Sequence, residues 1–573
     1  MLESLTLPPE RRDLRPIAPD DHGRFTGGMH AGGVVVPMLV NRPRLNKPPM
    51  IYWLQAGSAW VLTGGDAERD AIWMYRVPSM LAGLVCVLVT WRLGVMMVGP
   101  MAGWLTGACI AVCPVFAWEG HQARADMVLV AGTLVAMLAL WKVYVGGLGG
   151  GDMATQNSGH GTRVWAVVFW VATGFGILTK GPITPMVAVL TMVVLCIVHR
   201  RMRWLLGLRP WWGLLIVLAM VGPWVWAVGE RVGWDVYTKV VLDETLGRSV
   251  SAKEGHWGPP GYHALFVMLL LWPGSLAIVQ GLVGGWRSVR AREGGGLTFA
   301  MAWIAPSWVV FEIVGTKLPH YTMPLYPAMA MLAMSVVVNM TTQSRGHGTR
   351  GMGIGGHSRR VWRGVGLAVC AGPTVGLTAM MASDPLWRND MAWVAIGFAW
   401  VLAVLAVAMV MRGARRLASY GARATMTAGV IAGCIACVAT IGVMLPVARP
   451  VWVSDAMGQA IRAADPAGAR PLGMVSFHED SLIYHTRGRI ARLNQDQMGQ
   501  WWREHPEGML VIPESMVLRS HGVVARASGV NYSRGQRADL ALVTWWRPSP
   551  EGVGEEPEDE AEGTQIAPME PSP

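Results

Sequence analysis

The sequence predicts an integral membrane protein, an all-α bundle of about twelve membrane-spanning helices followed by a small external α/β domain. Two observations support this class. Apolar residues make up 52% of the 573 residues and charged residues only 15%, against roughly 25% charged in average soluble proteins. Apolar runs of about 17–23 residues, long enough to cross a bilayer core, also recur along the chain. The same composition excludes a disordered, collagen-like or disulfide-rich secreted protein.

The expected spans fill the chain between residues 77 and 447. They lie near 77–98, 101–119, 127–147, 163–179, 182–198, 211–229, 262–284, 298–316, 321–340, 364–382, 391–411 and 425–447. Residues 50–64 are apolar but short, which predicts an interfacial or re-entrant segment.

The charge distribution excludes one class of partner. The net charge of +11 and the pI near 9.6 first suggest a nucleic-acid binder. With 15% charged residues, however, too little polar surface remains to coat a globule of this size, so we expect no nucleic-acid partner. Residues 551–573 carry eight acids and no base, and the preceding 550 residues stand at +19. The tail is therefore expected to be disordered.

Arginine placement predicts which side of the membrane each loop faces, because cytoplasmic loops are enriched in Lys and Arg. Four loops, alternating properly across the predicted helices, hold sixteen Arg against one acid, Glu293. We assign them to the cytoplasm. The opposite side then receives residues 1–76, 120–126, 180–181, 230–261, 317–320 and 383–390 and everything after 448, and membrane lipids surround the predicted spans. The expected domains are a first external loop (1–76), a membrane domain (77–447), an external α/β domain (448–547) and an acidic tail (548–573).

Polar residues that resemble a site all fall on the predicted outer side. Five of the six Lys lie there, in a chain with 42 Arg. A lysine ammonium suits a phosphate in a tight pocket. The alternative, which implies no functional role, is that a lysine near a helix end extends its ammonium to the membrane surface (snorkelling). We favour snorkelling for Lys239 and Lys253, and function for Lys47 and Lys317. The other candidates are Asp21, Arg24, Asp126, Lys180, Glu244, Arg248, His256, Tyr262, His320 and Tyr321.

Acids and bases converging at an outer membrane surface suit a lipid-linked anionic substrate. Cations would hold the phosphate, and a carboxylate would accept a proton from an attacking hydroxyl group. The seven cysteines all lie within or at the ends of predicted helices, without the spacing of a metal site, so we expect them to be packing residues.

Five collinear motifs resemble the polytopic GT-C glycosyltransferases, which include the bacterial aminoarabinose transferase acting on lipid A and the protein O-mannosyltransferases. The motifs are RLNKPPMIYWLQAGSAWVLTG (44–64), YRVPSMLAGL (75–84), GHQARADMVLVAGTL (120–134), GFGILTKGPI (174–183) and GTKLPHYTMPLYPAMAML (315–332). The resemblance runs from about residue 13 to 545, and the collinear set is more specific than any single motif.

The resemblance implies that a sugar moves from a polyprenyl-phosphate donor to an acceptor at the periplasmic face of the bacterial inner membrane. Aligned on the family's first external loop, Asp21 would be the catalytic carboxylate and Asp126 a second essential acid. Lys47 and Lys317 would hold the donor phosphate, helped by three further residues, Arg248, His256 and Tyr321. The acceptor, a lipid, a glycan or a protein, is left open. No cofactor follows with certainty, and a divalent cation stays open.

The chain departs from the family pattern in its first loop. His22 stands where the family has an acid, and residues 26–37 are about one helical turn shorter than the usual form. The family also has a helix before this loop, thirteen in all, which predicts a helix encoded upstream of this chain. The C-terminal region resembles the family's small external domain, with a helix at 454–465 and strands at 471–477, 508–513 and 538–546. Within it, Glu479 and Asp480 would either face the site or be solvated loop residues.

Two other functional classes remain as alternatives. A secondary transporter would also have about twelve helices, but transporters usually place ionisable groups at mid-membrane, and here these groups lie in outer loops. An inactive family member that serves as a binding or assembly subunit is favoured by the two departures of the first loop.

Overall fold

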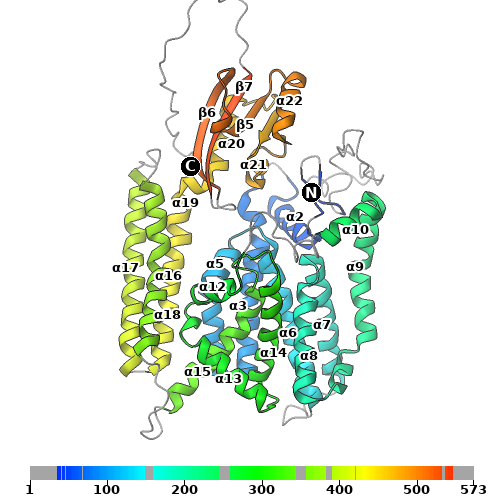
Figure 1. The fold of residues 1–573 in the computed structure, drawn as a ribbon, viewed down its shortest axis with the longest axis vertical. Helices are drawn as coiled ribbons and strands as arrows, with labels where there is room; N and C mark the ends of the chain where they lie inside the picture. Colours follow the sequence, from blue (N-terminus) through cyan, green and yellow to red (C-terminus); the bar gives the residue numbers. More distant parts are fainter. Residues whose placement is uncertain are drawn as a thin grey trace, which may run out of the picture. The chain divides into compact units, whose positions relative to one another are not determined.

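The structure, a computed structural model, describes residues 35–39, 42–45, 47–66, 69–148, 159–243, 258–343, 356–382, 390–419, 421–531 and 536–545. The chain forms two compact units, Met1–Arg449 and Pro450–Pro573. The first unit is helical and the second contains a five-stranded sheet (Figure 1).

Eight helical segments in the described part of the chain are long and apolar enough to cross a membrane. The prediction of a multi-pass helical membrane protein is therefore confirmed. The eight are α3 (Val77–Val98), α6 (Ala125–Leu148), α7 (Gly159–Lys180), α9 (Pro210–Val232), α14 (Gly296–Ile313), α16 (Gly356–Ala382), α17 (Asp390–Ser419), and the run from α18 (Gly421–Cys437) through a π-helical turn (Val438–Met444) to α19 (Leu445–Val447).

The four remaining apolar segments of the twelve expected are shorter or broken helices. α8 (Ile183–His199) and α15 (Tyr326–Gln343) are continuous but carry shorter apolar stretches. The segment near 101–119 is α4 (Pro100–Ala111) followed by α5 (Pro114–Gly120), bent by 55°. The segment near 262–284 splits into α12 (Tyr262–Leu270) and α13 (Ile278–Arg290).

Proline accounts for both breaks. Cys113, immediately before Pro114, has the extended backbone that a residue preceding proline prefers (φ −64°, ψ 121°). Pro273 lies between α12 and α13, where it removes an N–H donor and prevents one helix from continuing through the segment. Apolar run length alone does not detect such interruptions.

The short apolar segment near residues 50–64 is α2 (Met50–Thr63), a single helix of 14 residues. Fourteen residues rise about 21 Å in an α-helix, which is less than the ~30 Å of a bilayer core. A two-stranded ribbon of β1 (Met38–Leu39) and β2 (Arg42–Pro43) precedes it. This helix is therefore too short to span a membrane alone.

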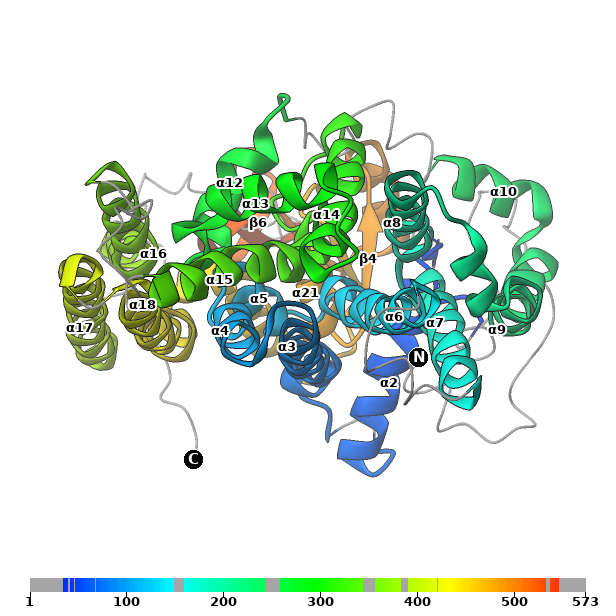
Figure 2. The same cartoon turned by 90° about the horizontal axis from the view of Figure 1, so that it is seen from below.

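The bundle is organised around α6. In its most apolar window 78% of the residues are buried inside the protein, against 22% for α9. α6 packs between α3 and α7, as the end-on view shows (Figure 2), while α16–α18 lie together on one side of this unit and α9 with α10 (Trp234–Leu242) on the other (Figure 1). Glycine permits close helix contact: a Cβ on Gly103 of α4 would lie 2.4 Å from the Val95 nitrogen of α3.

The second unit contains a mixed sheet in the order β4-β3-β5-β7-β6. β3 (Leu472–Val475) pairs in parallel with β4 (Ile490–Leu493) and β5 (Met509–Pro513), and β7 (Gln536–Trp545) pairs antiparallel with β5 and β6 (His521–Asn531). Its helices are α20 (Val453–Ala464), α21 (Asp480–His485) and α22 (Met498–Glu504). The predicted α/β architecture is confirmed, although β4 and β6 were not among the expected strands.

Asp465, which follows α20, provides a stability prediction for this unit. Its carboxylate is 6% exposed and accepts hydrogen bonds from the backbone N–H groups of Ala469 and Arg470, each at 3.0 Å. Burial alone would raise the pKa of Asp465, but these N–H groups and the Arg489 guanidinium lower it below its ordinary value.

We therefore expect Asp465→Asn to lower the free energy of unfolding of this unit by about 1–3 kcal/mol. The contribution of the charged carboxylate to the free energy of unfolding should be fully present above pH 3.8, the pKa in the unfolded chain. It should disappear as pH falls through the lower pKa of the folded state. Thermal unfolding of the full chain in detergent, measured at pH 7 and pH 3, tests this. Asp496 is an acid in the 3-10 turn Gln495–Gln497. An identical destabilisation by Asp496→Asn would contradict the role of the two N–H groups.

Candidate active site

A buried ion pair joins the first turn of α6 to the last residue of α7. Asp126 is 7% exposed, and its Oδ1 accepts a hydrogen bond from the Lys180 ammonium. A carboxylate is favoured near a helix N-terminus and a cation near a C-terminus, so the helix dipoles support both positions. Because α6 and α7 pack side by side and run in opposite directions, their sequence-distant ends meet at this point.

The connection between α14 and α15 brings an imidazole and a phenol to the same pair. His320 places Nε2 3.8 Å from Asp126 Oδ1, and the Tyr321 ring lies with its centroid 4.9 Å from the Lys180 ammonium. Burial is the main cause that lowers the pKa of His320 to about 4; nearby cations lower it further and Asp126 partly opposes them. At neutral pH the imidazole is therefore uncharged. Tyr321 provides a cation–π contact to Lys180.

A second buried carboxylate, Glu119, lies at the end of α5. It is 1% exposed, and its Oε1 is 3.7 Å from Arg124 Nη1 and 3.6 Å from His320 Nδ1. In the described part of the chain its Oε2 has no hydrogen-bond partner, which is uncommon for a buried oxygen. Glu119 was not among the predicted site residues. A single acid at the end of an apolar run is the available sequence signal, and it does not distinguish a site residue from one facing solvent.

Lys47, in the connection before α2, belongs to the same electrostatic cluster. Burial lowers the pKa of Lys47 to about 8, the Lys180 charge adds to this effect, and Asp126 opposes it. The acid–base cluster, as we define it, consists of Lys47, Glu119, Arg124, Asp126, Lys180, His320 and Tyr321. Three cations face two carboxylates in it, which makes it suited to an anionic group.

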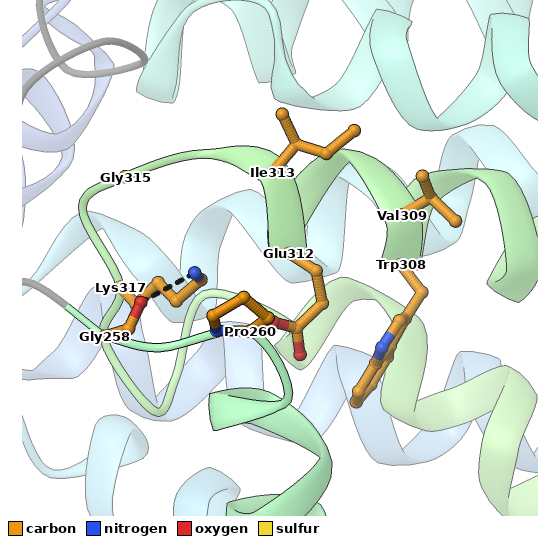
Figure 3. Close-up of a pocket in the computed structure, with 8 residues that line it drawn as sticks. All are labelled: Gly258, Pro260, Trp308, Val309, Glu312, Ile313, Gly315 and Lys317. Atoms are coloured by element: carbon orange, nitrogen blue, oxygen red, sulfur yellow. Dashed lines mark hydrogen bonds between the residues drawn. The ribbon is translucent and has the colours of Figure 1, made fainter.

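Lys317 and Tyr262 occupy a different environment. The Lys317 ammonium donates a hydrogen bond to the Gly258 carbonyl at 2.8 Å, and Tyr262 packs against the same glycine. Lys317 lines an open pocket of about 560 Å³ together with Gly258, Pro260, Trp308, Val309, Glu312, Ile313 and Gly315 (Figure 3). None of these residues belongs to the acid–base cluster. In the described residues no hydrogen bond or ion pair joins Lys317 to that cluster.

Five predicted site residues lie outside the described residues: Asp21, Arg24, Glu244, Arg248 and His256. Their roles, including that of Asp21 as catalytic carboxylate, stay predictions. Within the described ranges no group of three or more His, Cys, Asp or Glu side chains is arranged to hold a metal ion.

The family-model match covers five of the seven residues of this cluster: Lys47, Glu119, Arg124, Asp126 and Lys180. Residues 46–226 match the family model described as dolichyl-phosphate-mannose-protein mannosyltransferase. An undecaprenyl phosphate-alpha-4-amino-4-deoxy-L-arabinose arabinosyl transferase of Edwardsiella ictaluri is 24% identical over 317 residues, covering 55% of this chain and 53% of the relative. The corresponding transferase of Serratia proteamaculans is 24% identical over 306 residues, covering 53% and 51%. The chain thus spans about half the length of the curated relatives it matches.

The fold is similar over almost the whole chain to a solved structure. ArnT from Cupriavidus metallidurans bound to undecaprenyl phosphate superposes with a TM-score of 0.67 at 20% identity, covering 94% of this chain and 96% of ArnT. The apo structure of the same protein gives a TM-score of 0.65 at 19% identity, covering 94% and 95%. The resemblance of the motifs is therefore confirmed: residues 46–226 are similar to the dolichyl-phosphate-mannose-protein mannosyltransferase family, and the chain has an ArnT-like fold.

Proposed function

We propose that this chain is a membrane glycosyltransferase that moves a sugar from a polyprenyl-phosphate donor to an acceptor at the periplasmic face of a bacterial inner membrane. The observation that carries the proposal is the buried Asp126–Lys180 pair, with Tyr321 over the ammonium and Lys47 nearby. Three of these four residues lie in the segment that matches the family model. The name of the arabinosyl transferase relatives supports undecaprenyl phosphate as the carrier of the sugar.

In the proposed reaction, an acceptor oxygen bonds to the anomeric carbon while the bond between that carbon and the phosphate oxygen breaks, and negative charge develops on the departing polyprenyl phosphate. Lys47 and Lys180 would stabilise this charge, since preorganised cations in a site with little water act more strongly than in solution. Asp126 would orient the Lys180 ammonium. Because Asp126 is engaged by Lys180, we assign the base to Asp21 when the acceptor is a hydroxyl group, and a phosphate acceptor needs no base.

The neutral imidazole of His320 fits this assignment. It adds no further positive charge between the two carboxylates, so Lys47, Arg124 and Lys180 supply the cations of the cluster. Lys317, which the resemblance assigns to the donor phosphate, contacts Gly258 in the separate pocket, so we leave it out of this step.

A transfer assay tests the proposal. The purified protein in lipid nanodiscs is incubated with undecaprenyl phosphate carrying a radiolabelled sugar and with lipid, glycan or peptide acceptors. We expect labelled acceptor and free undecaprenyl phosphate to form in equal amounts. Mass spectrometry of envelope lipids and glycans from a deletion strain should show one species that loses a sugar. Binding of the donor without any transfer, together with an unchanged envelope, would instead indicate an inactive binding subunit.

A further inference from the structure

The pocket beside Lys317 lies at the end of a predicted membrane span and has an exposed, apolar outer wall. Its wall on α14 includes Val309 and Ile313, which are 56% and 74% exposed although both are apolar. α14 is long and apolar enough to cross a membrane, and Ile313 is its last residue. Exposed apolar side chains on such a helix contact acyl chains, so the outer wall of the pocket faces the bilayer.

The charged side chains of this pocket lie at the level expected for lipid headgroups. Glu312 is in the last turn of α14, and Lys317 follows four residues after its end. Trp308, one turn before Glu312, has the amphipathic ring that is enriched at the membrane–water interface. The pocket therefore combines an apolar outer wall with two opposite charges at the boundary between hydrocarbon and headgroups.

Lys317 has unused hydrogen-bonding capacity. Lys317 is only 5% exposed, and its ammonium has three N–H donors. In the described residues its hydrogen bond goes to a single acceptor, the Gly258 carbonyl. A buried ammonium with one acceptor is incompletely satisfied, and a phosphate oxygen would complete it.

Glu312 also keeps acceptor sites after its contacts in the protein. Its Oε2 accepts from Gly261 N at 3.1 Å and its Oε1 from His263 N at 3.2 Å, which caps the first turn of α12. Two ionised carboxylate oxygens offer about four lone-pair positions. The remaining positions suit a cationic donor.

We propose that this pocket binds a membrane phospholipid whose headgroup is zwitterionic and carries a primary amine. The phosphate lies against Lys317, the ammonium against Glu312, and an acyl chain follows Val309 and Ile313. A choline headgroup has the same charges but no N–H donor for Glu312, and a glycerol headgroup leaves Glu312 without a cation. This inference is independent of the proposed glycosyltransferase activity.

Native mass spectrometry tests this inference. The full chain is delipidated and then titrated with phosphatidylethanolamine, phosphatidylcholine or phosphatidylglycerol of identical acyl chains. We expect one phosphatidylethanolamine to be retained about tenfold more tightly than either competitor, the effect of one charge-assisted hydrogen bond. Lys317→Met should weaken all phospholipids, whereas Glu312→Gln should remove only the preference for the amine. Lys239→Met and Glu230→Gln, at exposed residues of the same unit, are the matched controls.

Three results would overturn the proposal: equal retention of the three phospholipids by the unmodified protein, an equal loss in the control variants, or displacement of phosphatidylethanolamine by stoichiometric undecaprenyl phosphate in a Lys317-dependent manner. The last result would assign the pocket to the sugar donor. Thermal unfolding of each variant identifies any that fail to fold. If Lys317→Met fails to fold, Lys317→Arg, which keeps the cation, is tested in its place, and its retention of lipid decides whether the proposal holds.

Discussion

Replacing Asp126 by alanine is expected to lower kcat/KM for sugar transfer by about a thousandfold. Two consequences follow from the loss of one carboxylate. The Lys180 ammonium loses the hydrogen bond that holds it beside the Tyr321 ring, so it could no longer meet the donor phosphate of the proposed reaction in a defined position. It also loses its ion-pair partner while its side chain is only 18% exposed.

The second consequence affects folding as well as catalysis. Removing one partner of a buried ion pair typically costs about 3–5 kcal/mol, whereas removing both is often nearly neutral. We therefore expect Asp126→Ala/Lys180→Met to unfold at a higher temperature than Asp126→Ala while remaining inactive. Asp235→Ala removes an acid from the first turn of another helix, α10, and should leave both properties unchanged.

Radiolabelled transfer in nanodiscs, together with thermal unfolding in detergent, gives the two measurements for each variant. Activity of the double variant close to that of the unmodified protein would show that the pair serves only to hold α6 and α7 together. In that case the cluster would be structural, and the catalytic groups would have to be found elsewhere in the chain.

The membrane class and most helices were predictable because hydrocarbon imposes a length and a composition that the sequence displays directly. The breaks at Pro114 and Pro273 were not, since each lies within an apolar run whose total length suggests one span. In the second unit, β3, β5 and β7 form the buried centre of the sheet and were recognised by their apolar runs. β6 is an edge strand whose described residues alternate irregularly between exposed and buried, so its composition gave little signal.

The candidate site shows what a sequence can and cannot specify. Asp126, Lys180, His320 and Tyr321 were selected because polar residues in short outer loops are few. Their pairing depends on the ends of α6 and α7 meeting the α14–α15 connection, which is a property of helix packing and not of any local pattern. Glu119 was missed because its neighbours in the sequence are apolar. Lys317 was grouped with Lys47 by residue type and by the family resemblance, and the structure gives the two lysines different neighbours.

Replacing Lys47 by methionine is expected to lower kcat/KM for the donor by about a hundredfold, through the loss of one cation that opposes the developing phosphate charge. The effect should appear in KM as well as kcat, because the ground-state donor already carries a negative phosphate. Lys239→Met, at an exposed lysine of α10, is the matched control and should leave both constants unchanged.

The pH dependence of kcat/KM separates a role in binding phosphate from a structural role of Lys47. In the free protein the pKa of this ammonium is lowered to about 8, mainly by burial. The charged form therefore predominates below pH 8, and affinity for the donor should fall as pH rises through that value. Lys47→Arg keeps a cation whose pKa exceeds 12, so this variant should retain donor affinity at pH 9, where the unmodified protein loses it. An alkaline decline that is identical in Lys47→Arg would show that another group titrates, and it would contradict the assignment of this pH dependence to the charge of Lys47.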